Sequence, residues 1–191
     1  MSATKDLATW HWTRETYHRA VDMGLFGENP RLELIRGEIY LKMPMNRPHA
    51  TAVSKAEKVI ANTFGDGYYI LSQLPIGLST DGEPEPDVSV VAGEPDDYVE
   101  HPTESDVLLV LEISDSTLAF DQGLKSETYA EAGIPEYWIL DINTRTLEVR
   151  QEPRGKRYYS TRLYNDTESV SPRVKPTVSL VVSSLLPKQS D

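Results

Sequence analysis

The strongest constraint on the fold of this chain is residues 107–113, Val-Leu-Leu-Val-Leu-Glu-Ile, which are almost all apolar. A run of this length and composition is typical of a strand that is buried on both faces, at the centre of a sheet. Glu112 stands near its end, and a buried carboxylate is costly unless it is paired or coordinates a cation. The segment therefore predicts a central strand that carries a carboxylate with a partner.

The neighbouring segments predict an α/β (α+β) protein with a mixed central β-sheet flanked by helices. A helix over residues 121–132, ended by Gly133 and Pro135, and an apolar strand over residues 136–141 follow the central strand. Strand, helix and strand in succession form a βαβ unit, whose two strands are parallel. We also expect helices over 13–21 and 48–64, a hairpin around Arg36-Gly37, and strands over 68–72, 76–79, 87–91 and 147–151.

Length and composition limit the class of protein. A chain of 191 residues is most simply one domain, here with a short N-terminal helix and a flexible C-terminal tail. The chain has no cysteine, which excludes disulfides, thiolate metal sites and cysteine nucleophiles. No apolar run is long enough to span a bilayer, and the N-terminus lacks a signal pattern, so we expect no membrane partner and a cytoplasmic location.

The charge distribution argues both for and against a phosphate-containing substrate. The formal net charge of −11 repels a polyanion such as DNA. Residues 59–124 contain no Lys or Arg but many carboxylates, whereas residues 145–162 are locally basic. Lys125 is the first cation after the acidic stretch, which makes it conspicuous.

Three residues in this region form a candidate catalytic set. Asp87 follows Pro86 at the start of a predicted strand, and Glu112 closes the central strand. If the two strands are neighbours, both carboxylates can bind one Mg²⁺ or Mn²⁺, which prefers oxygen ligands and lowers the pKa of a bound water. Lys125 would then orient that water or neutralise charge on the phosphate. On a helix, Asp121, Lys125 and Tyr129 share one face.

Each of these residues also has a simpler interpretation. Asp87 after a proline can be a turn residue, and Glu112 can be paired with a buried arginine. Lys125 can be a solvated residue on the exposed side of its helix. Asp121 is most simply a helix N-cap or a salt-bridge partner of Lys125, and Tyr129 a core aromatic.

Several motifs resemble a known nuclease family. They are Pro86-Asp87, Glu112-Ile-Ser114, and Asp121-Gln-Gly-Leu-Lys125 followed by the segment from Tyr129 to Asp141. This order is similar to the PD-(D/E)XK nuclease superfamily, and more narrowly to the Uma family of proposed restriction endonucleases, a domain of unknown function. The resemblance covers residues 32–186 and implies a restriction-endonuclease-like core.

The resemblance also implies roles for individual residues. By analogy Asp87, Glu112 and the main-chain carbonyl of Ile113 bind Mg²⁺, and Lys125 is the catalytic lysine. The superfamily usually places its lysine two residues after the Glu, where this chain has Ser114, so the lysine would come from the next helix.

Two softer candidates lie earlier in the chain. Glu33 is where an acidic residue from an N-terminal element would complete the metal site, although strand alternation is equally consistent with an ordinary exposed glutamate. His49 lies at a predicted helix start and could contact phosphate, although a capping or surface role is simpler.

Three functions remain open from the sequence. The first is an Mg²⁺-dependent endonuclease that hydrolyses DNA phosphodiesters, as a homodimer whose two sites reach both strands and with specificity supplied by a partner protein. The second is a catalytically silent binding or interaction module that keeps the nuclease fold. The third is a phosphohydrolase acting on a substrate smaller than DNA, which the negative charge would tolerate better.

Overall fold

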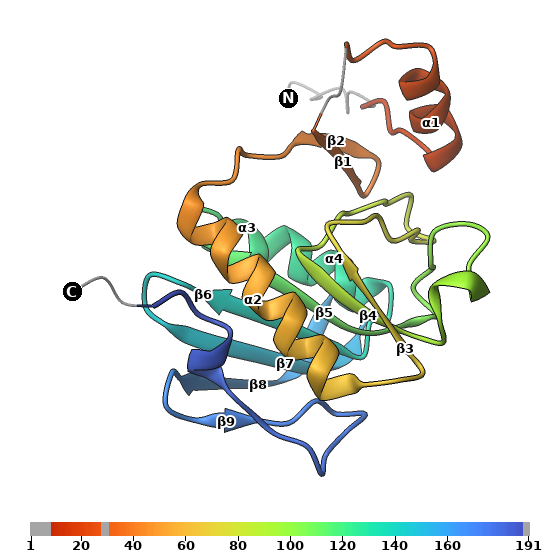
Figure 1. The fold of residues 1–191 in the computed structure, drawn as a ribbon. Coiled ribbons are helices and arrows are strands. Elements are labelled where there is room, and N and C mark those ends of the chain that lie inside the picture. Colours follow the sequence, from red (N-terminus) through yellow and green to blue (C-terminus); the bar gives the residue numbers. More distant parts are fainter. Residues whose placement is uncertain (1–8, 28–30, 189–191) are drawn as a thin grey trace, which may run out of the picture.

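The centre of the computed structural model, which describes residues 9–27 and 31–188, is a mixed six-stranded sheet (Figure 1). The strand order is β3-β4-β5-β6-β7-β8, and only β5 and β6 are parallel. The strands are β3 (Tyr68–Ser72), β4 (Val88–Ala92), β5 (Val107–Ser114), β6 (Glu136–Asp141), β7 (Thr146–Arg154) and β8 (Arg157–Asn165). The predicted βαβ unit and the central position of residues 107–113 are confirmed.

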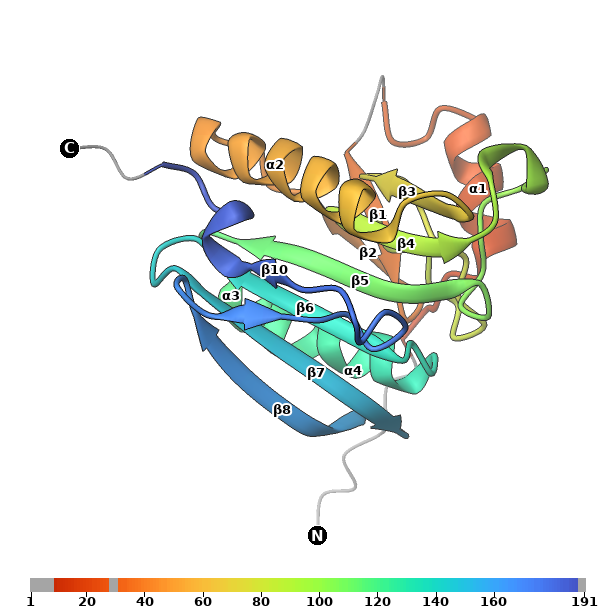
Figure 2. The same cartoon turned by 60° about the horizontal axis from the view of Figure 1, so that its bottom comes forward.

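One face of the sheet is covered by the long helix α2 (Arg47–Phe64). Asn46 caps it by accepting a hydrogen bond from the His49 main-chain N–H, Pro48 lies in its first turn, and Gly65 ends it at φ 65°. Its buried side chains pack on the central strands, and the C-terminal segment joins them on the same face (Figure 2). That segment contains β9 (Ser169–Val170), β10 (Leu180–Val181) and the 3₁₀ turn η3 (Val182–Ser184).

The opposite face carries a helix with an irregular middle. It begins as α3 (Leu118–Phe120), continues as a π-helical turn, η2 (Asp121–Lys125), and ends as α4 (Ser126–Glu131). Figure 2 shows α2 and α4 on opposite sides of the sheet. The predicted helix over 121–132 is confirmed in place, but it begins earlier, at Leu118. Single π-helical turns inside α-helices occur often at functional sites.

The N-terminal elements lie above one end of the sheet (Figure 1). They are α1 (Arg14–Asp22), capped by Thr13, and the hairpin of β1 (Leu32–Ile35) and β2 (Glu38–Leu41). Later in the chain, the 3₁₀ turn η1 (Pro95–Asp97) lies in the loop after β4. An antiparallel bridge between Leu34 and Glu83 joins the hairpin to the loop that leads into β4. The hairpin is thereby placed beside the first residues of β4.

Two expectations are corrected by the structure. Residues 76–79 form only isolated bridges at Gly77 and Leu78, not a strand. The C-terminal segment is not a flexible tail as far as Leu186, because Leu185 and Leu186 are fully buried against α2; residues 189–191 lie outside the described residues. Within the described ranges, no helix is long and apolar enough to cross a bilayer.

Candidate active site

The register of the sheet brings Asp87 and Glu112 together. Val88 pairs with Leu111 across β4 and β5, so Asp87, one residue before β4, lies opposite Glu112. The Ile113 main-chain N–H donates to Asp87 Oδ2 at 2.9 Å, and the Asp87 N–H lies 3.4 Å from Glu112 Oε2. The two predicted carboxylates are therefore neighbours, as the sequence interpretation required.

Glu112 is buried with two donors on one oxygen. Its Oε1 accepts from Lys125 Nζ at 2.8 Å and from the Tyr129 hydroxyl at 2.7 Å. Burial, with the carboxylates nearby, raises the pKa of Glu112 to about 7 against the opposing effect of Lys125. Tyr129 is a fully buried core aromatic, as expected, whose hydroxyl also holds the candidate carboxylate. The arginine partner considered for Glu112 is replaced by Lys125.

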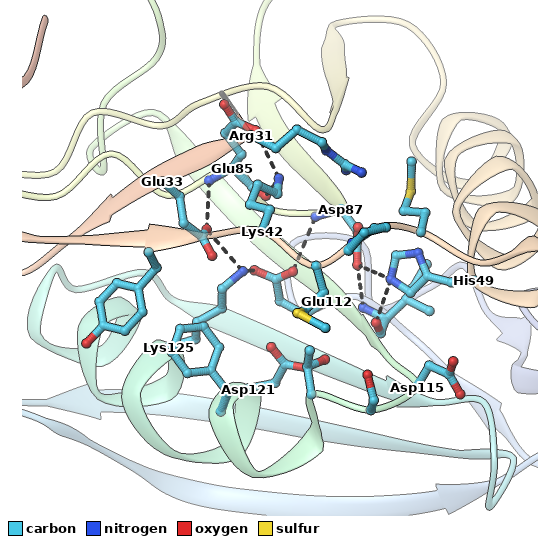
Figure 3. Close-up of a pocket in the computed structure, with 18 of the residues that line it drawn as sticks. Arg31, Glu33, Lys42, His49, Glu85, Asp87, Glu112, Asp115, Asp121 and Lys125 are labelled. Atoms are coloured by element: carbon cyan, nitrogen blue, oxygen red, sulfur yellow. Dashed lines mark hydrogen bonds and ion pairs between the residues drawn. The ribbon is translucent and has the colours of Figure 1, made fainter. Parts of the chain in front are cut away.

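Lys125 lies between two carboxylates (Figure 3). Its Nζ is 2.8 Å from Glu112 Oε1 and 3.3 Å from Glu33 Oε2, and only 7% of its side chain is exposed. Burial alone would lower the pKa of Lys125, but the carboxylates around it raise the pKa above its ordinary value. Lys125 is therefore a firmly protonated cation and not a solvated surface lysine.

Glu33 reaches this cluster from the hairpin. Only 4% of the residue is exposed, so the interpretation of Glu33 as an ordinary exposed glutamate is wrong. Besides contacting Lys125, its carboxylate accepts a hydrogen bond from the Glu85 main-chain N–H at 3.4 Å. The hairpin thus adds a third carboxylate beside Asp87 and Glu112.

Asp121 has a structural role. Its Oδ2 accepts from the Ser114 hydroxyl at 2.5 Å and from the Thr117 hydroxyl at 2.7 Å. Because the helix begins at Leu118, Asp121 is not its N-cap, and among the described residues it forms no ion pair with Lys125. Ser114, at the position where the superfamily usually has its lysine, therefore ties β5 to the helix that supplies Lys125 instead.

His49 lies at the centre of the predicted ligand set. Its Nε2 is 2.9 Å from the Ile113 carbonyl oxygen and 3.2 Å from Asp87 Oδ2. Both neighbours are acceptors, so Nε2 carries the proton and donates to them. Burial lowers the pKa of His49, but the Asp87 carboxylate outweighs this and raises it. The simpler surface or capping role is wrong for the imidazole, because Asn46 supplies the cap.

The charge of Asp87 is stabilised by these contacts. Burial would raise the pKa of Asp87, but His49, the Ile113 amide and Lys125 lower it. Asp87 is thus ionised at neutral pH and is not only a turn residue.

Three further residues complete the site and carried no clear sequence signal. Gln73, held at φ 53°, donates from Nε2 to Asp87 Oδ1 at 3.2 Å. A non-glycine residue with positive φ is strained, and such residues cluster at functional sites. Lys42 pairs with Glu85 at 2.9 Å, and Arg31 lines the same pocket.

Apart from Ser114 and Tyr129, which lie behind it, the residues of the site border one pocket of about 450 Å³ (Figure 3). Three cations line it, Arg31, Lys42 and Lys125, against six carboxylates, Glu33, Glu85, Asp87, Glu112, Asp115 and Asp121. The excess of negative charge means that a phosphate could enter only together with a cation. The pocket therefore favours binding of a divalent metal ion over binding of an anionic substrate alone.

The donor set fits Mg²⁺ chemically. Asp87, Glu112 and the Ile113 carbonyl offer only oxygen atoms, and Mg²⁺ commonly takes one or two carboxylates with waters filling its octahedron. Glu112 Oε2 receives only the 3.4 Å contact from the Asp87 amide and so keeps lone pairs for a cation. No group of three or more His, Cys, Asp or Glu side chains in the described part of the chain is arranged as a metal site. The fit therefore rests on two carboxylates and a carbonyl.

Comparisons with known proteins agree with this architecture. The chain is similar to the crystal structure of a "putative nuclease belonging to DUF820" from Anabaena variabilis ATCC 29413, with a TM-score of 0.64 and 19% identity over 82% of this chain and 89% of that chain. At that identity the likeness shows that the two proteins share a fold. No curated protein matches. The model of the Uma2 family, described as "Putative restriction endonuclease", matches residues 14–183, so the chain belongs to the Uma2 family.

Proposed function

We propose that this protein is an Mg²⁺-dependent endonuclease that hydrolyses the phosphodiester bonds of DNA. Asp87, Glu112 and the Ile113 carbonyl would hold the metal ion, with Mn²⁺ as a substitute, and Lys125 would be the catalytic cation. The observation that carries the proposal is the convergence of these groups, far apart in sequence, in one open pocket. Membership in the Uma2 family supports a nuclease.

The residues divide the chemistry between them. Bound Mg²⁺ supplies a Lewis acid for the phosphate and lowers the pKa of a coordinated water. Lys125 is firmly protonated and cannot take a proton from water, so its ammonium group stabilises negative charge that develops on the phosphate. Glu33 and Glu112 hold that ammonium in place. His49 and Gln73 orient the Asp87 carboxylate.

Substrate, assembly and location are further parts of the proposal. DNA is the substrate suggested by the family, and a homodimer would place two such sites on the two strands of a duplex. A partner protein would supply sequence specificity. The cytoplasmic location also stays a prediction.

A phosphohydrolase of smaller substrates is the second candidate. It is favoured by the excess of carboxylates over cations in the pocket, which opposes a long polyanion more than a small ester. The catalytically silent module is less well supported, because Asp87, Glu112 and Lys125 all line one open pocket.

The test combines metal binding with strand cleavage. Calorimetry should detect Mn²⁺ binding to wild type but not to Asp87→Asn, and wild type but not Lys125→Met should nick supercoiled plasmid in Mg²⁺. Asp96→Asn and Lys58→Met change exposed residues and should behave as wild type. Each variant needs an unfolding curve, because Lys125 is buried.

The outcomes separate the candidates. Mn²⁺ binding that depends on Asp87, with hydrolysis of bis(p-nitrophenyl) phosphate but no nicking, would favour the smaller substrate. Binding without either hydrolysis would favour the silent module. Absence of Mn²⁺ binding to the wild type would contradict the proposed metal site.

A further inference from the structure

The pocket has an apolar half that the proposed hydrolysis does not use. We call this half the apolar rim; its members are Tyr40, Leu41, Met43, Met45 and Phe120. Leu41 is 72% exposed and Met43 is 64% exposed. Contiguous exposed apolar side chains beside a pocket commonly mark a binding surface. The rim thus requires an occupant with an apolar surface.

The rim continues directly into the catalytic cluster. The rings of Tyr40 and Phe120 lie 5.3 Å apart between centroids, and Lys125 Nζ lies 5.9 Å from the Phe120 centroid. An occupant of the rim would therefore lie close to a phosphate bound at Lys125. Arg31 and Lys42 line the same pocket and offer cations to adjacent phosphates.

A nucleotide has the two halves that this pocket has. Its base is a flat ring with an apolar face that stacks on aromatic and apolar side chains, and its phosphate is an anion. A volume of about 450 Å³ lies in the range of pockets that enclose a small molecule. The lining of the pocket therefore matches a base on the rim and its phosphate at Asp87, Glu112 and Lys125.

An intact duplex fits such a pocket less well than an unpaired strand does. Its bases are paired and stacked inside the helix, so a base reaches a concave site only when it is unpaired or turned out of the stack. Duplex binding would instead depend on many cations facing phosphates. The pocket supplies three, of which Lys42 and Lys125 are already paired with carboxylates. Stacking on the rim is thus the larger source of affinity available here.

We propose that the apolar rim binds an unpaired base, so that the preferred substrate is single-stranded DNA. This inference rests on the proposed function, since it names the substrate of the same site. The rim residues position the strand and take no part in the chemistry.

Binding to matched oligonucleotides tests the proposal. Fluorescence anisotropy in Ca²⁺ would compare a labelled oligothymidylate, the duplex that it forms with oligoadenylate, and the same single strand with one abasic position. Single-stranded DNA should bind about tenfold more tightly than the duplex, and the missing base should weaken binding, because its stacking on the rim is lost. Equal or tighter binding of the duplex, or no measurable binding of the single strand, would overturn the proposal.

A double variant tests whether the apolar rim is responsible for the binding of single-stranded DNA. Leu41→Ser/Met43→Ser should weaken binding of the single strand about tenfold and leave the salt dependence unchanged, because no phosphate contact is lost. Leu163→Ser, an exposed leucine on β8 with 61% exposure, is the matched control and should have no effect. Unchanged binding by the double variant would overturn the assignment to the rim.

Hydrolysis of bis(p-nitrophenyl) phosphate in Mn²⁺ separates this inference from the proposed function. That reagent reports on the metal site, and the control Leu163→Ser should hydrolyse it at the wild-type rate. Hydrolysis by the wild type without preference for single strands leaves the nuclease proposal intact and rejects the rim proposal. No hydrolysis and no Mn²⁺ binding would reject the proposed function itself.

Discussion

Two glutamates on neighbouring central strands, Glu112 on β5 and Glu136 on β6, are similarly buried but face opposite sides of the sheet. Glu112 is 3% exposed and points toward α4, whereas Glu136 is 0% exposed and lies on the α2 side with Trp138. Glu136 accepts hydrogen bonds from Trp138 Nε1, Gln151 Nε2 and the Arg173 main-chain N–H. Its partners are all neutral donors, and it does not border the candidate active-site pocket.

The difference shows what distinguishes a structural carboxylate from a candidate catalytic one. Both satisfy the rule that a buried carboxylate needs partners. Only Glu112 has a lysine beside it, other carboxylates within reach and an oxygen that faces a pocket. Burial of an acidic residue is therefore weak evidence for function until its neighbours and its access are known.

The largest expected difference between the two glutamates is in activity. Glu112→Gln should lower metal-dependent plasmid nicking by about 10²–10³-fold, because the proposed metal ligand and the anchor of Lys125 are lost. Glu136→Gln should keep the wild-type rate per folded molecule, measured by normalising to the folded fraction. A large loss with Glu136→Gln would remove the functional distinction.

Removal of Lys125 should show how strongly the stability of the cluster around Glu112 depends on this cation. Lys125→Met leaves Glu112 and Glu33 without their buried partner, so the free energy of unfolding should fall by about 3–5 kcal/mol. Urea unfolding measures this change, and the double variant Lys125→Met/Glu112→Gln should recover part of it. A single variant as stable as wild type would show that the ion pair adds nothing.

Glu112 should also make the stability of the protein depend on pH. The pKa of Glu112 rises from 4.5 to about 7 on folding, so between these values the folded state binds a proton that the unfolded state releases. The free energy of unfolding therefore falls as pH increases through this window. In EDTA, Glu112→Gln should gain stability relative to wild type from about pH 5 to about pH 8, by up to about 3 kcal/mol. A constant difference in urea titrations at the two pH values would contradict the raised pKa.

Glu136→Gln tests the structural side of the comparison. An amide offers one acceptor oxygen, so a donor that now faces its NH₂ group is left unsatisfied and the free energy of unfolding should fall by about 2 kcal/mol. Thermal or urea unfolding measures it. Glu131→Gln, on the partly exposed end of α4, is the control and should change stability little.

The smallest effect should come from the hydroxyl on Glu112. Tyr129→Phe removes one donor to Oε1, which Lys125 still contacts, so stability should fall by about 1 kcal/mol and nicking should persist at a reduced rate. Tyr158→Phe, whose hydroxyl bonds the Ile134 carbonyl, gives the same stability loss without the effect on nicking. Equal rates in the two variants would show that Tyr129 is purely structural.

The central part of the fold could be predicted because its signals are local. The apolar run of β5, the helix ended by Gly133 and the strand after it specify a βαβ unit from neighbouring residues alone. Asp87 and Glu112 could be paired once β4 and β5 were taken as neighbours. Lys125 stood out because no other cation preceded it for a long distance and because its motif resembled that of a nuclease family.

The remaining features depend on contacts between distant segments. Glu33 is buried because the hairpin bridges to Glu83, and strand alternation cannot reveal such a contact. The strained backbone of Gln73 and the π-helical turn that ends at Lys125 cannot be recognised from the composition of the sequence. The C-terminal segment carries the apolar residues Leu185 and Leu186, and both are buried. Such apolar residues, and not the polar residues between the strands, determine whether a terminal segment packs on the core.

The packing of that C-terminal segment has a consequence for synthesis of the chain. Leu185 and Leu186 cover α2, which is made more than a hundred residues earlier. The helix whose first turn holds His49 therefore keeps part of its apolar face open until residue 186 has left the ribosome. The site should gain its final rigidity last, so a nascent chain would carry Asp87 and Glu112 long before it could hold His49 firmly against them.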